Sequence, residues 1–234
     1  ITALIGILTA IESVKHSLTE NFTRMGANTF TIKNRPSFVH FGGNNSNRPK
    51  NYPPITYEQA KEFLNNYDFD AVSSVYITAA RMATLKYYSE KTNPNVVVVG
   101  ADNKFFETSG NEIDIGRNFS ASEILNGSSV IILGNDLRNI LFKQKQTPIG
   151  EYITVGANKF QVVGILKSKG AGMGGSNDNI CYVPVSNVQK YFKSSWASYS
   201  INVMTKTTEA QDYAIDEATA LLRNIRKIPV NKDN

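Results

Sequence analysis

The amino-acid sequence predicts an α+β fold made of two lobes, with a long helix in front of them. Three observations lead to this fold class. Apolar residues recur at helical steps through the first 25 residues, strand–helix–strand and strand–helix patterns stand near the two chain ends, and the middle third is rich in strands. We expect the chain ends to pair into one βαβ-type lobe, with the strand-rich lobe inserted and both termini on the same side.

These patterns also set the domain boundaries that we expect. Residues 1–26 form a stalk helix, residues 27–101 and 197–234 form the α/β lobe, and residues 102–196 form the inserted, mainly β lobe. A chain of 234 residues is long enough to bury a sizeable core in one large domain or two small ones.

The N-terminal segment has the pattern of one long amphipathic helix, followed by Gly26 at the position of a C-terminal cap. The apolar positions of its stripe are Leu4, Ile7, Ile11, Val14, Leu18, Phe22 and Met25. Residues 1–11 carry no charge, but they would rise only about 16 Å as a helix, whereas a membrane span needs about 20 residues. The chain begins with Ile1, and the segment lacks the basic start and cleavage site of a signal peptide. We therefore expect this stalk to continue from a transmembrane helix.

The α/β lobe is expected to begin with a strand over residues 28–33, where Phe30 and Ile32 alternate with threonines. Residues 34–54 are rich in Asn, Pro, Gly and Ser, which predicts a long surface loop. Thr56 and Gln59 have the spacing of a capping box, which opens a helix to about Asn66. The side chains expected to face inward from this helix are Ala60, Phe63 and Leu64.

Strand patterns continue through the next segment. We expect two strands, at residues 71–77 and 79–88, and then a turn at residues 89–94. Residues 96–99 are four consecutive valines, a run typical of a strand that is buried on both faces.

The middle of the chain predicts a strand at residues 129–133 and a short helix at residues 135–142. Residues 152–155 and 160–166 have the pattern of a hairpin around the turn at 156–159. Lys169–Gly175 is rich in glycine, but no Lys-Ser/Thr pair or helix follows it, so a flexible loop is favoured over a phosphate or dinucleotide site.

The last part of the chain alternates strands with short helices. Strands are expected at residues 180–183 and 199–204. Ser186 has the pattern of a cap for a helix ending near Phe192, and Thr208 that of a cap for a helix ending near Arg226, whose basic last turn suits the helix dipole.

Composition and charge exclude several classes of protein. Hydrophobic residues make up 41% and charged residues 19% of the chain, which fits a globular protein and not a disordered one. The net charge of +5 is scattered and not gathered on a basic, aromatic face, so we expect no nucleic-acid partner. The single cysteine, Cys181, stands in an apolar run and is expected to be a buried hydrophobic side chain.

The sequence offers no catalytic, cofactor-binding or metal-binding candidate, and the partner-binding residues stay unknown. Neither His16 nor His40 has neighbours at the spacing of a metal site or a nucleophilic triad. The acidic residues show no paired pattern; those considered are Glu107, Glu112, Asp114 and Glu123. Because two carboxylates far apart in sequence can still meet in the fold, a glycosidase-like pair stays open.

A series of short motifs runs in order along the chain. The motifs are Gly26–Ile32, Val98–Gly100, Phe105–Phe106, Ile115–Phe119 followed by Glu123, Val130–Gly134, Leu141–Phe142, Pro148–Val155, Phe160–Leu166 and Val183–Pro184. Each motif is weak alone, but together they cover most of the chain, and their order resembles the periplasmic core domain of MacB-type ABC transporter permeases. The Asn-rich stretch at residues 34–54 departs from that family pattern.

Within this resemblance, the glycines and the arginine of the motifs have structural roles. We expect Gly116, Gly150 and Gly164 to serve turns or close backbone approaches. Arg117 is expected to pair with a nearby carboxylate or to hold a loop carbonyl, and not to contact a substrate.

The resemblance implies a membrane-anchored permease that dimerises with a second permease subunit in the inner membrane and works with a cytoplasmic ABC ATPase, fused or separate. Drugs, peptides or lipoproteins would pass to a periplasmic adaptor and an outer-membrane duct. The chain would be the periplasmic domain, or an extracellular one in a Gram-positive source. Its two lobes would be porter-like and sabre-like. It would need no cofactor and would couple ATP hydrolysis to export by mechanical transmission and partner docking.

Three other functions stay open on the sequence. One is a ligand-sensing extracytoplasmic module of a membrane signalling protein. Another is a lipoprotein-release permease of the same broad family, and a third is a hydrolase of the cell envelope.

Overall fold

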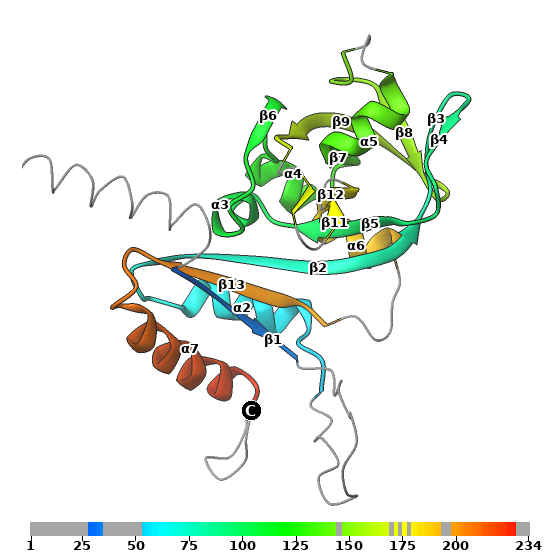
Figure 1. Ribbon diagram of the computed structural model, residues 1–234. Helices are drawn as coiled ribbons and strands as arrows, with labels where there is room; N and C mark the ends of the chain where they lie inside the picture. Colours follow the sequence, from blue (N-terminus) through cyan, green and yellow to red (C-terminus); the bar gives the residue numbers. More distant parts are fainter. Residues whose placement is uncertain are drawn as a thin grey trace, which may run out of the picture.

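The computed structural model describes residues 28–34, 53–143, 147–168, 171–172, 175–176, 179–192 and 198–227. In this part of the chain, one mixed sheet of eleven strands runs through the molecule, with short helices on its faces (Figure 1). The strands of this sheet are β1 (Thr29–Lys33), β2 (Ala71–Ala83), β3 (Leu85–Tyr87), β4 (Glu90–Lys91), β5 (Val96–Ala101), β6 (Ile113–Gly116), β7 (Val130–Leu133), β8 (Tyr152–Val155), β9 (Asn158–Leu166), β12 (Ile180–Pro184) and β13 (Ser200–Thr205). The helices are α2 (Tyr57–Asn66), α3 (Phe105–Thr108), α4 (Ala121–Asn126), α5 (Asn135–Phe142), α6 (Val185–Tyr191) and α7 (Gln211–Ile225). The expected α+β class is confirmed.

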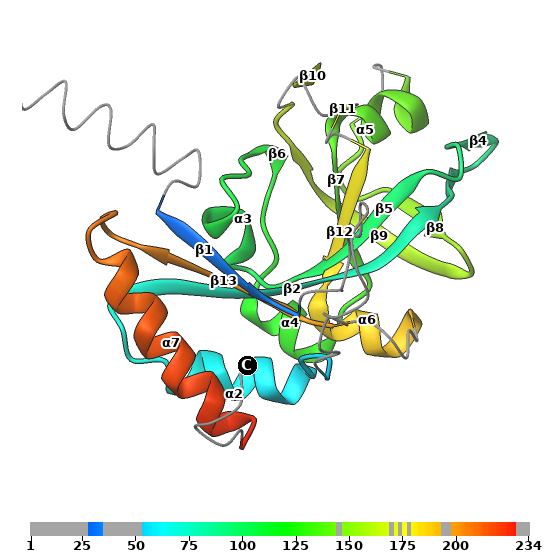
Figure 2. The ribbon, with the colours of Figure 1, turned by 60° about the horizontal axis from the view of Figure 1, so that its bottom comes forward.

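The sheet begins with three antiparallel strands in the order β1-β13-β2, which bring both ends of the described chain together. Alternation along these strands puts Ile32, Ile201 and Val75 in one cross-strand row, on the face that α2 and α7 cover. Figure 2 shows α2 and α7 side by side on that face, where the Tyr67 hydroxyl donates to the Ala214 carbonyl at 2.8 Å. The capping box of Thr56 and Gln59 opens α2 as expected.

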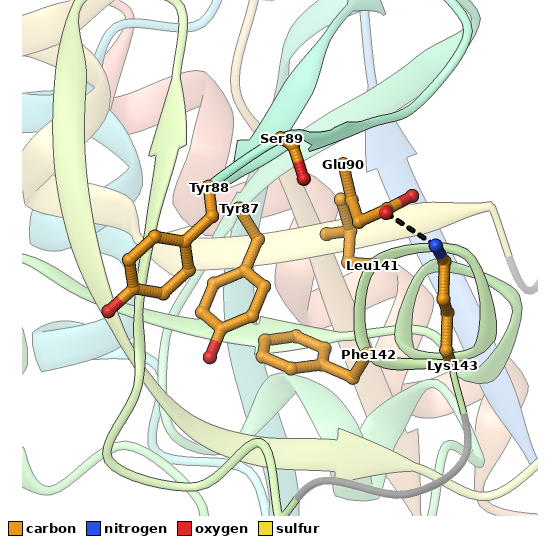
Figure 3. A pocket seen from close by; sticks show the side chains of 7 residues that line it. All are labelled: Tyr87, Tyr88, Ser89, Glu90, Leu141, Phe142 and Lys143. Carbon is orange, nitrogen blue, oxygen red and sulfur yellow. Dashed lines mark ion pairs between the residues drawn. The ribbon is translucent and has the colours of Figure 1, made fainter.

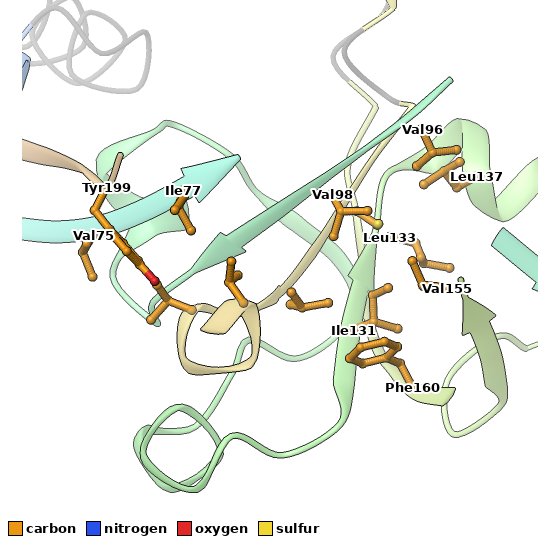
Figure 4. Close-up of a cluster of buried hydrophobic side chains, with 14 of the residues drawn as sticks. Val75, Ile77, Val96, Val98, Ile131, Leu133, Leu137, Val155, Phe160 and Tyr199 are labelled. Carbon is orange, nitrogen blue, oxygen red and sulfur yellow. The ribbon is translucent and has the colours of Figure 1, made fainter. Parts of the chain in front are cut away.

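From β2 the sheet continues as β5-β12-β7-β9-β8-β3-β4, and β6 pairs with β9. Strand β3 follows β2 after a single residue, Thr84. The series of paired strands that starts at β2 and β5 therefore ends at β3, which continues β2 along the chain, so the sheet curls back towards its own start. This curled sheet encloses the larger core, in which Figure 4 shows Val98, Leu133, Leu137, Val155 and Phe160 gathered from separate elements.

The expected break between strands at residues 77 and 79 is wrong. The structure has one strand, β2, through this point, and its pairing with β5 shifts register between Thr78 and Ala80 and again between Ala80 and Ala83. These irregularities bend a continuous strand, so the chain changes direction without a turn. The break comes later, at Thr84. Strand β3 lies at the end of the second expected strand, and β4 lies in the region 89–94, where a turn was expected.

A second, smaller core lies on the outer side of the curled sheet. Phe105 and Phe106 of α3 pack there against Tyr182, with ring centroids 5.6 and 5.1 Å apart. Tyr76 of β2 also contacts Phe105, at 5.0 Å between ring centroids. This aromatic cluster fixes α3 against both β2 and β12.

Two expected helix caps are wrong. Helix α6 begins directly after Pro184, whose φ is −51°, and so one residue before Ser186, whose hydroxyl donates instead to the Ile124 carbonyl. The backbone carbonyl of Thr208, and not its side chain, accepts from the Gln211 amide at 3.2 Å, so α7 begins only at Gln211.

Other expectations meet mixed outcomes. The strand at residues 129–133, the helix at 135–142 and the hairpin of β8 and β9 are confirmed, although the hairpin turn has two residues and not four. The glycine-rich stretch holds two short antiparallel strands, β10 (Ala171–Gly172) and β11 (Gly175–Ser176), which form their own ladder.

The stalk expected at residues 1–26, His16 and His40 lie outside the described residues, as do residues 35–52 of the loop expected at residues 34–54. Within the described residues, none of the helices has both the length and the apolar character that crossing a membrane requires.

Candidate functional site

The far end of the sheet from β1 carries a cavity of about 350 Å³ between the β3–β4 hairpin and the end of α5. Its lining residues, shown in Figure 3, are Tyr87, Tyr88, Ser89, Glu90, Leu141, Phe142 and Lys143. We call this cavity the tip pocket. It combines aromatic walls with one ion pair, between Glu90 and Lys143, at its rim.

Local backbone conformation shapes the tip pocket. Tyr88 at the hairpin turn and Lys143 after α5 both adopt left-handed conformations, with φ of 47° and 43°. Residues other than glycine rarely adopt this backbone conformation, so packing around each turn must stabilise it. The Tyr87 ring lies 4.4 Å from Phe142 and 4.8 Å from Tyr88 between centroids, and its hydroxyl donates to Glu151 at 3.1 Å. Tyr88 itself is 89% exposed, so the pocket presents an aromatic side chain to solvent.

A buried carboxylate, Asp102, directly follows β5 and binds the backbone of β2 and of the residue before α3. Asp102 Oδ2 accepts from the Val75 amide at 2.7 Å, and Oδ1 accepts from the Lys104 amide at 3.0 Å. The Asp102 amide donates in turn to the Val75 carbonyl at 3.2 Å. Burial raises the pKa of Asp102 to about 6, although the backbone amides and Lys104 favour its charged form. This side chain joins β2 to the start of α3.

A second contact between β2 and α3 lies beside Asp102. The hydroxyls of Ser74 and Thr108, both buried, are 2.6 Å apart, and the Thr108 hydroxyl donates to the Phe105 carbonyl. Because buried polar groups are costly unless they are paired, these bonds specify one placement of α3 on β2.

Arg117 pairs with a nearby carboxylate and holds a loop carbonyl, as expected. Its guanidinium donates to both carboxylate oxygens of Glu123, at 2.8 and 2.7 Å, and to the Asn118 carbonyl at 3.0 Å. This ion pair lowers the pKa of Glu123 to about 2, with further help from Ser120, which forms a capping box with Glu123 at the start of α4. Arg117 therefore secures the loop between β6 and α4.

Two glycines allow β6 to approach β9. Gly116 has φ of +88°, and a Cβ at this position would lie 2.3 Å from the Val163 carbonyl oxygen. A Cβ on Gly164 would lie 2.6 Å from the Arg117 carbonyl oxygen. Gly150 also has a positive φ, +89°, in the turn before β8. The expected roles of these glycines in turns and close backbone approach are confirmed.

The acidic residues considered from the sequence have separate surroundings. Glu123 binds Arg117, Glu112 pairs with Lys167 at 3.0 Å, and Glu107 and Asp114 are exposed on α3 and β6. Cys181 is fully buried on β12, as expected, and burial raises the pKa of its thiol. Among the described residues, no group of three or more His, Cys, Asp or Glu side chains is placed to hold a metal ion.

Sequence reasoning missed the tip pocket and Asp102. The signal for Asp102 was available in part, because a carboxylate directly after the buried valine strand, three residues before an aromatic pair, is typical of a side chain that caps a turn. The tip pocket had no such signal, since its two sides are about fifty residues apart in the sequence.

Most of the chain resembles a known protein family. A model of the family described as the MacB-like periplasmic core domain matches residues 1–221. The chain is 26% identical over 188 residues to the macrolide export ATP-binding/permease protein MacB of Hahella chejuensis, covering 80% of this chain and 27% of that protein. It is 36% identical over 90 residues to the pyoverdine export ATP-binding/permease protein PvdT of Pseudomonas entomophila, covering 38% of this chain and 14% of that protein. The chain thus spans roughly a quarter of the length of the MacB proteins that it matches.

Two solved structures are similar in fold. The periplasmic region of MacB from Actinobacillus actinomycetemcomitans superposes with a TM-score of 0.66 at 18% identity, covering 89% of this chain and 88% of that chain. The extracellular domain of the noncanonic ABC-type transporter YknZ from Gram-positive bacteria gives a TM-score of 0.58 at 22% identity, covering 74% of this chain and 85% of that chain. At these identities the similarity shows the fold alone.

Proposed function

Because the chain belongs to the family of MacB-like periplasmic core domains, we propose that it couples ATP hydrolysis by a cytoplasmic ABC ATPase to export across the cell envelope. It acts by mechanical transmission and partner docking and is not itself a catalyst. The observation that carries the proposal is the match of the family over residues 1–221. The cargo is a drug, a peptide or a lipoprotein, and two relatives are named for export of macrolides and pyoverdine.

The domain arrangement in this proposal follows the boundaries expected from the sequence. Residues 1–26 are the stalk that leads from a transmembrane helix, and residues 27–101 with 197–234 are the lobe next to the membrane. Residues 102–196 are the inserted lobe, which faces the partners together with the β3–β4 hairpin that pairs with its strand β8. The contacts of Asp102 and of Ser74 with Thr108 support transmission between these lobes, because they join β2 directly to α3 through buried side chains.

The partners belong to the whole transporter. They are a second permease subunit, an ABC ATPase that is fused or separate, and a periplasmic adaptor with an outer-membrane duct. The domain lies on the periplasmic side of the inner membrane, or outside the cell in a Gram-positive source. The exposed aromatic rim of the tip pocket supports a docking role at the end of the sheet away from β1.

Electron spin distance measurements on the full-length transporter in lipid nanodiscs test the transmission. Spin labels are attached at Tyr213→Cys on α7 or at Leu125→Cys on α4, both at exposed positions, while the buried Cys181 stays unlabelled. We expect the distance between equivalent labels of two subunits to change when ATP binds. The change should be absent when the ATPase is inactivated.

The proposal is contradicted if these distances stay the same with and without ATP in a preparation that hydrolyses ATP at its normal rate. An unchanged distance at α4 alone, with movement at α7, would contradict transmission into the inserted lobe.

A further inference from the structure

A row of lysines crosses four neighbouring strands at the end of the sheet that carries the tip pocket. Lys91 of β4 lies opposite Lys86 of β3, Lys86 lies opposite Thr154 of β8, and Thr154 lies opposite Lys159 of β9. Side chains that are directly opposite each other in a sheet point to the same face. We call Lys86, Lys91 and Lys159 the lysine row.

The lysine row lies on the outer face of these strands. The residues next to it along the strands, such as Leu85, Ile153 and Phe160, are buried in the larger core, while all three lysines are exposed. Tyr152 flanks the row with 51% of its surface exposed, and the Lys159 ammonium lies 4.7 Å from the centre of its ring.

Carboxylates near these strands are engaged elsewhere. Glu90 is opposite Tyr87 and binds Lys143 at the tip pocket, and Glu151 accepts from the Tyr87 hydroxyl. Among the residues that the structure describes, no carboxylate forms an ion pair with the lysine row. Within this described part, the positive charges therefore stand together on one face without a paired negative charge.

This placement is unfavourable in the isolated domain, because like charges directly opposite each other in a sheet repel. An acidic partner would remove the repulsion of Lys86 and Lys91. We propose that the lysine row binds an acidic segment of a partner protein. The proposal rests on the docking role proposed above, of which it names the surface and the partner chemistry.

The dimensions of the row fit an extended segment. Three strand spacings separate Lys91 from Lys159, which is about 14 Å. In an extended chain, residues i, i+2 and i+4 point to one side and span about 13 Å. Acidic residues at alternate positions would therefore meet all three lysines. Tyr152 offers an adjacent aromatic surface for an intervening side chain.

Binding of a defined peptide tests the proposal. The 234-residue chain, labelled with nitrogen-15, is titrated with a peptide of alternating Glu and Thr, about seven residues long, and amide shifts are followed by NMR. We expect the shift changes to gather on β3, β4, β8 and β9. In the variant Lys86→Gln/Lys91→Gln/Lys159→Gln, the affinity should fall about tenfold.

A matched variant separates the lysine row from general charge attraction. The variant Lys33→Gln/Lys61→Gln/Lys190→Gln removes the same charge from exposed positions on β1, α2 and α6, and it should bind within about twofold of the unchanged chain. Thermal unfolding by circular dichroism confirms that both variants are folded. Equal weakening in the two variants, or an unchanged affinity in the row variant, overturns the proposal.

Vesicles of phosphatidylglycerol test the competing anionic surface. Binding to vesicles that depends on the lysine row, without binding to the peptide that depends on it, would assign the row to a membrane and overturn the proposal. Because these assays need neither the ATPase nor the full-length transporter, their failure is distinguishable from a failure of mechanical transmission.

Discussion

Two carboxylates of this domain show how the surroundings of one side chain set its charge. Asp102 is buried between β2 and α3, and the loss of water raises its pKa to about 6. Glu123 is held by Arg117 at the surface, and its pKa is lowered to about 2. The two groups therefore change stability in opposite directions and in different ranges of pH.

The raised pKa of Asp102 predicts a loss of stability as the pH rises from about 4 to about 6. In this range the folded chain binds more protons than the unfolded chain, in which the pKa is 3.8, so the free energy of unfolding falls with pH by up to about 3 kcal/mol. In Asp102→Asn this contribution is absent. Denaturant unfolding at a series of pH values should show the difference between the two chains changing below about pH 6 and constant above about pH 7.

Glu123 does not obscure this comparison. Its stabilising contribution is present above pH 4.5 and is lost as the pH falls towards 2, and it is the same in both chains. Parallel curves for the unchanged chain and Asp102→Asn between about pH 4 and 6 would show that Asp102 does not titrate in this range.

The two sites also differ in how far sequence could predict them. Arg117 and Glu123 are six residues apart and belong to one motif, so pairing of Arg117 with a nearby carboxylate was predicted correctly. The Val75 amide that binds Asp102 is 27 residues away, on a strand whose neighbours the sequence did not define. Local pattern carries no information on a contact of that kind.

Among the elements, the turn after β6 depends on Gly116. A Cβ there would meet the Val163 carbonyl oxygen at 2.3 Å and would add to the strain of a positive φ, so we expect Gly116→Ala to lower the free energy of unfolding by about 2–4 kcal/mol. Gly156 has φ of +60° and no atom within 4 Å of the place that a Cβ would take, so Gly156→Ala should cost only about 1 kcal/mol. Equal losses in denaturant unfolding would contradict the close approach of β6 and β9.

In the β3–β4 hairpin, the repulsion between Lys86 and Lys91 of the lysine row should lower stability. Lys86→Glu replaces a repulsive cross-strand pair with an attractive one, so we expect the free energy of unfolding to rise by about 0.5 kcal/mol at low salt. The gain should shrink in about 1 M salt, since exposed charges are then screened. Lys33→Glu is the control, because Lys33 lies opposite the neutral Ser200. The same gain in both variants would mean that it comes from net charge.

Sequence patterns predicted elements well where one periodicity governed them. The valine run of β5, the helix α5 and the hairpin of β8 and β9 were all placed within a few residues. The pattern failed in β2, where the pairing is irregular at Thr78 and Ala80. Such an interruption looks the same in sequence whether the strand ends or bulges, and only the pairing partner β5 decides between them.

At the scale of the whole molecule, Cys181 reports on global unfolding. It lies on β12 between β5 and β7, is fully buried, and has a raised thiol pKa, so a thiol reagent can reach it only when the sheet opens. We expect its labelling to be slower than that of an exposed thiol by a factor on the order of 10⁴ or more. Introducing Leu125→Cys into the same chain gives a fast phase for comparison. Labelling of Cys181 at a similar rate would mean that β12 opens locally.

The order of strands in the sheet could not be predicted from sequence. A hairpin such as that of β8 and β9 joins segments that are adjacent in the chain, so its pairing follows from the turn between them. By contrast, β1 pairs with β13, which lies near the other end of the chain. The tip pocket and the lysine row depend on long-range order of this kind. Their residues were therefore visible in the sequence, while the surfaces that they form were not.

The continuity of β2 gives the domain a stiffness that depends on direction. This strand is bonded to β13 on one side and to β5 on the other, and it passes into β3 after a single residue. A pull along its axis loads the hydrogen bonds of both ladders in shear, so many bonds must yield together. A pull across the axis peels the same bonds apart one after another. Tension is therefore carried best along β2, and the angle at which force arrives decides whether the domain moves as a body or opens.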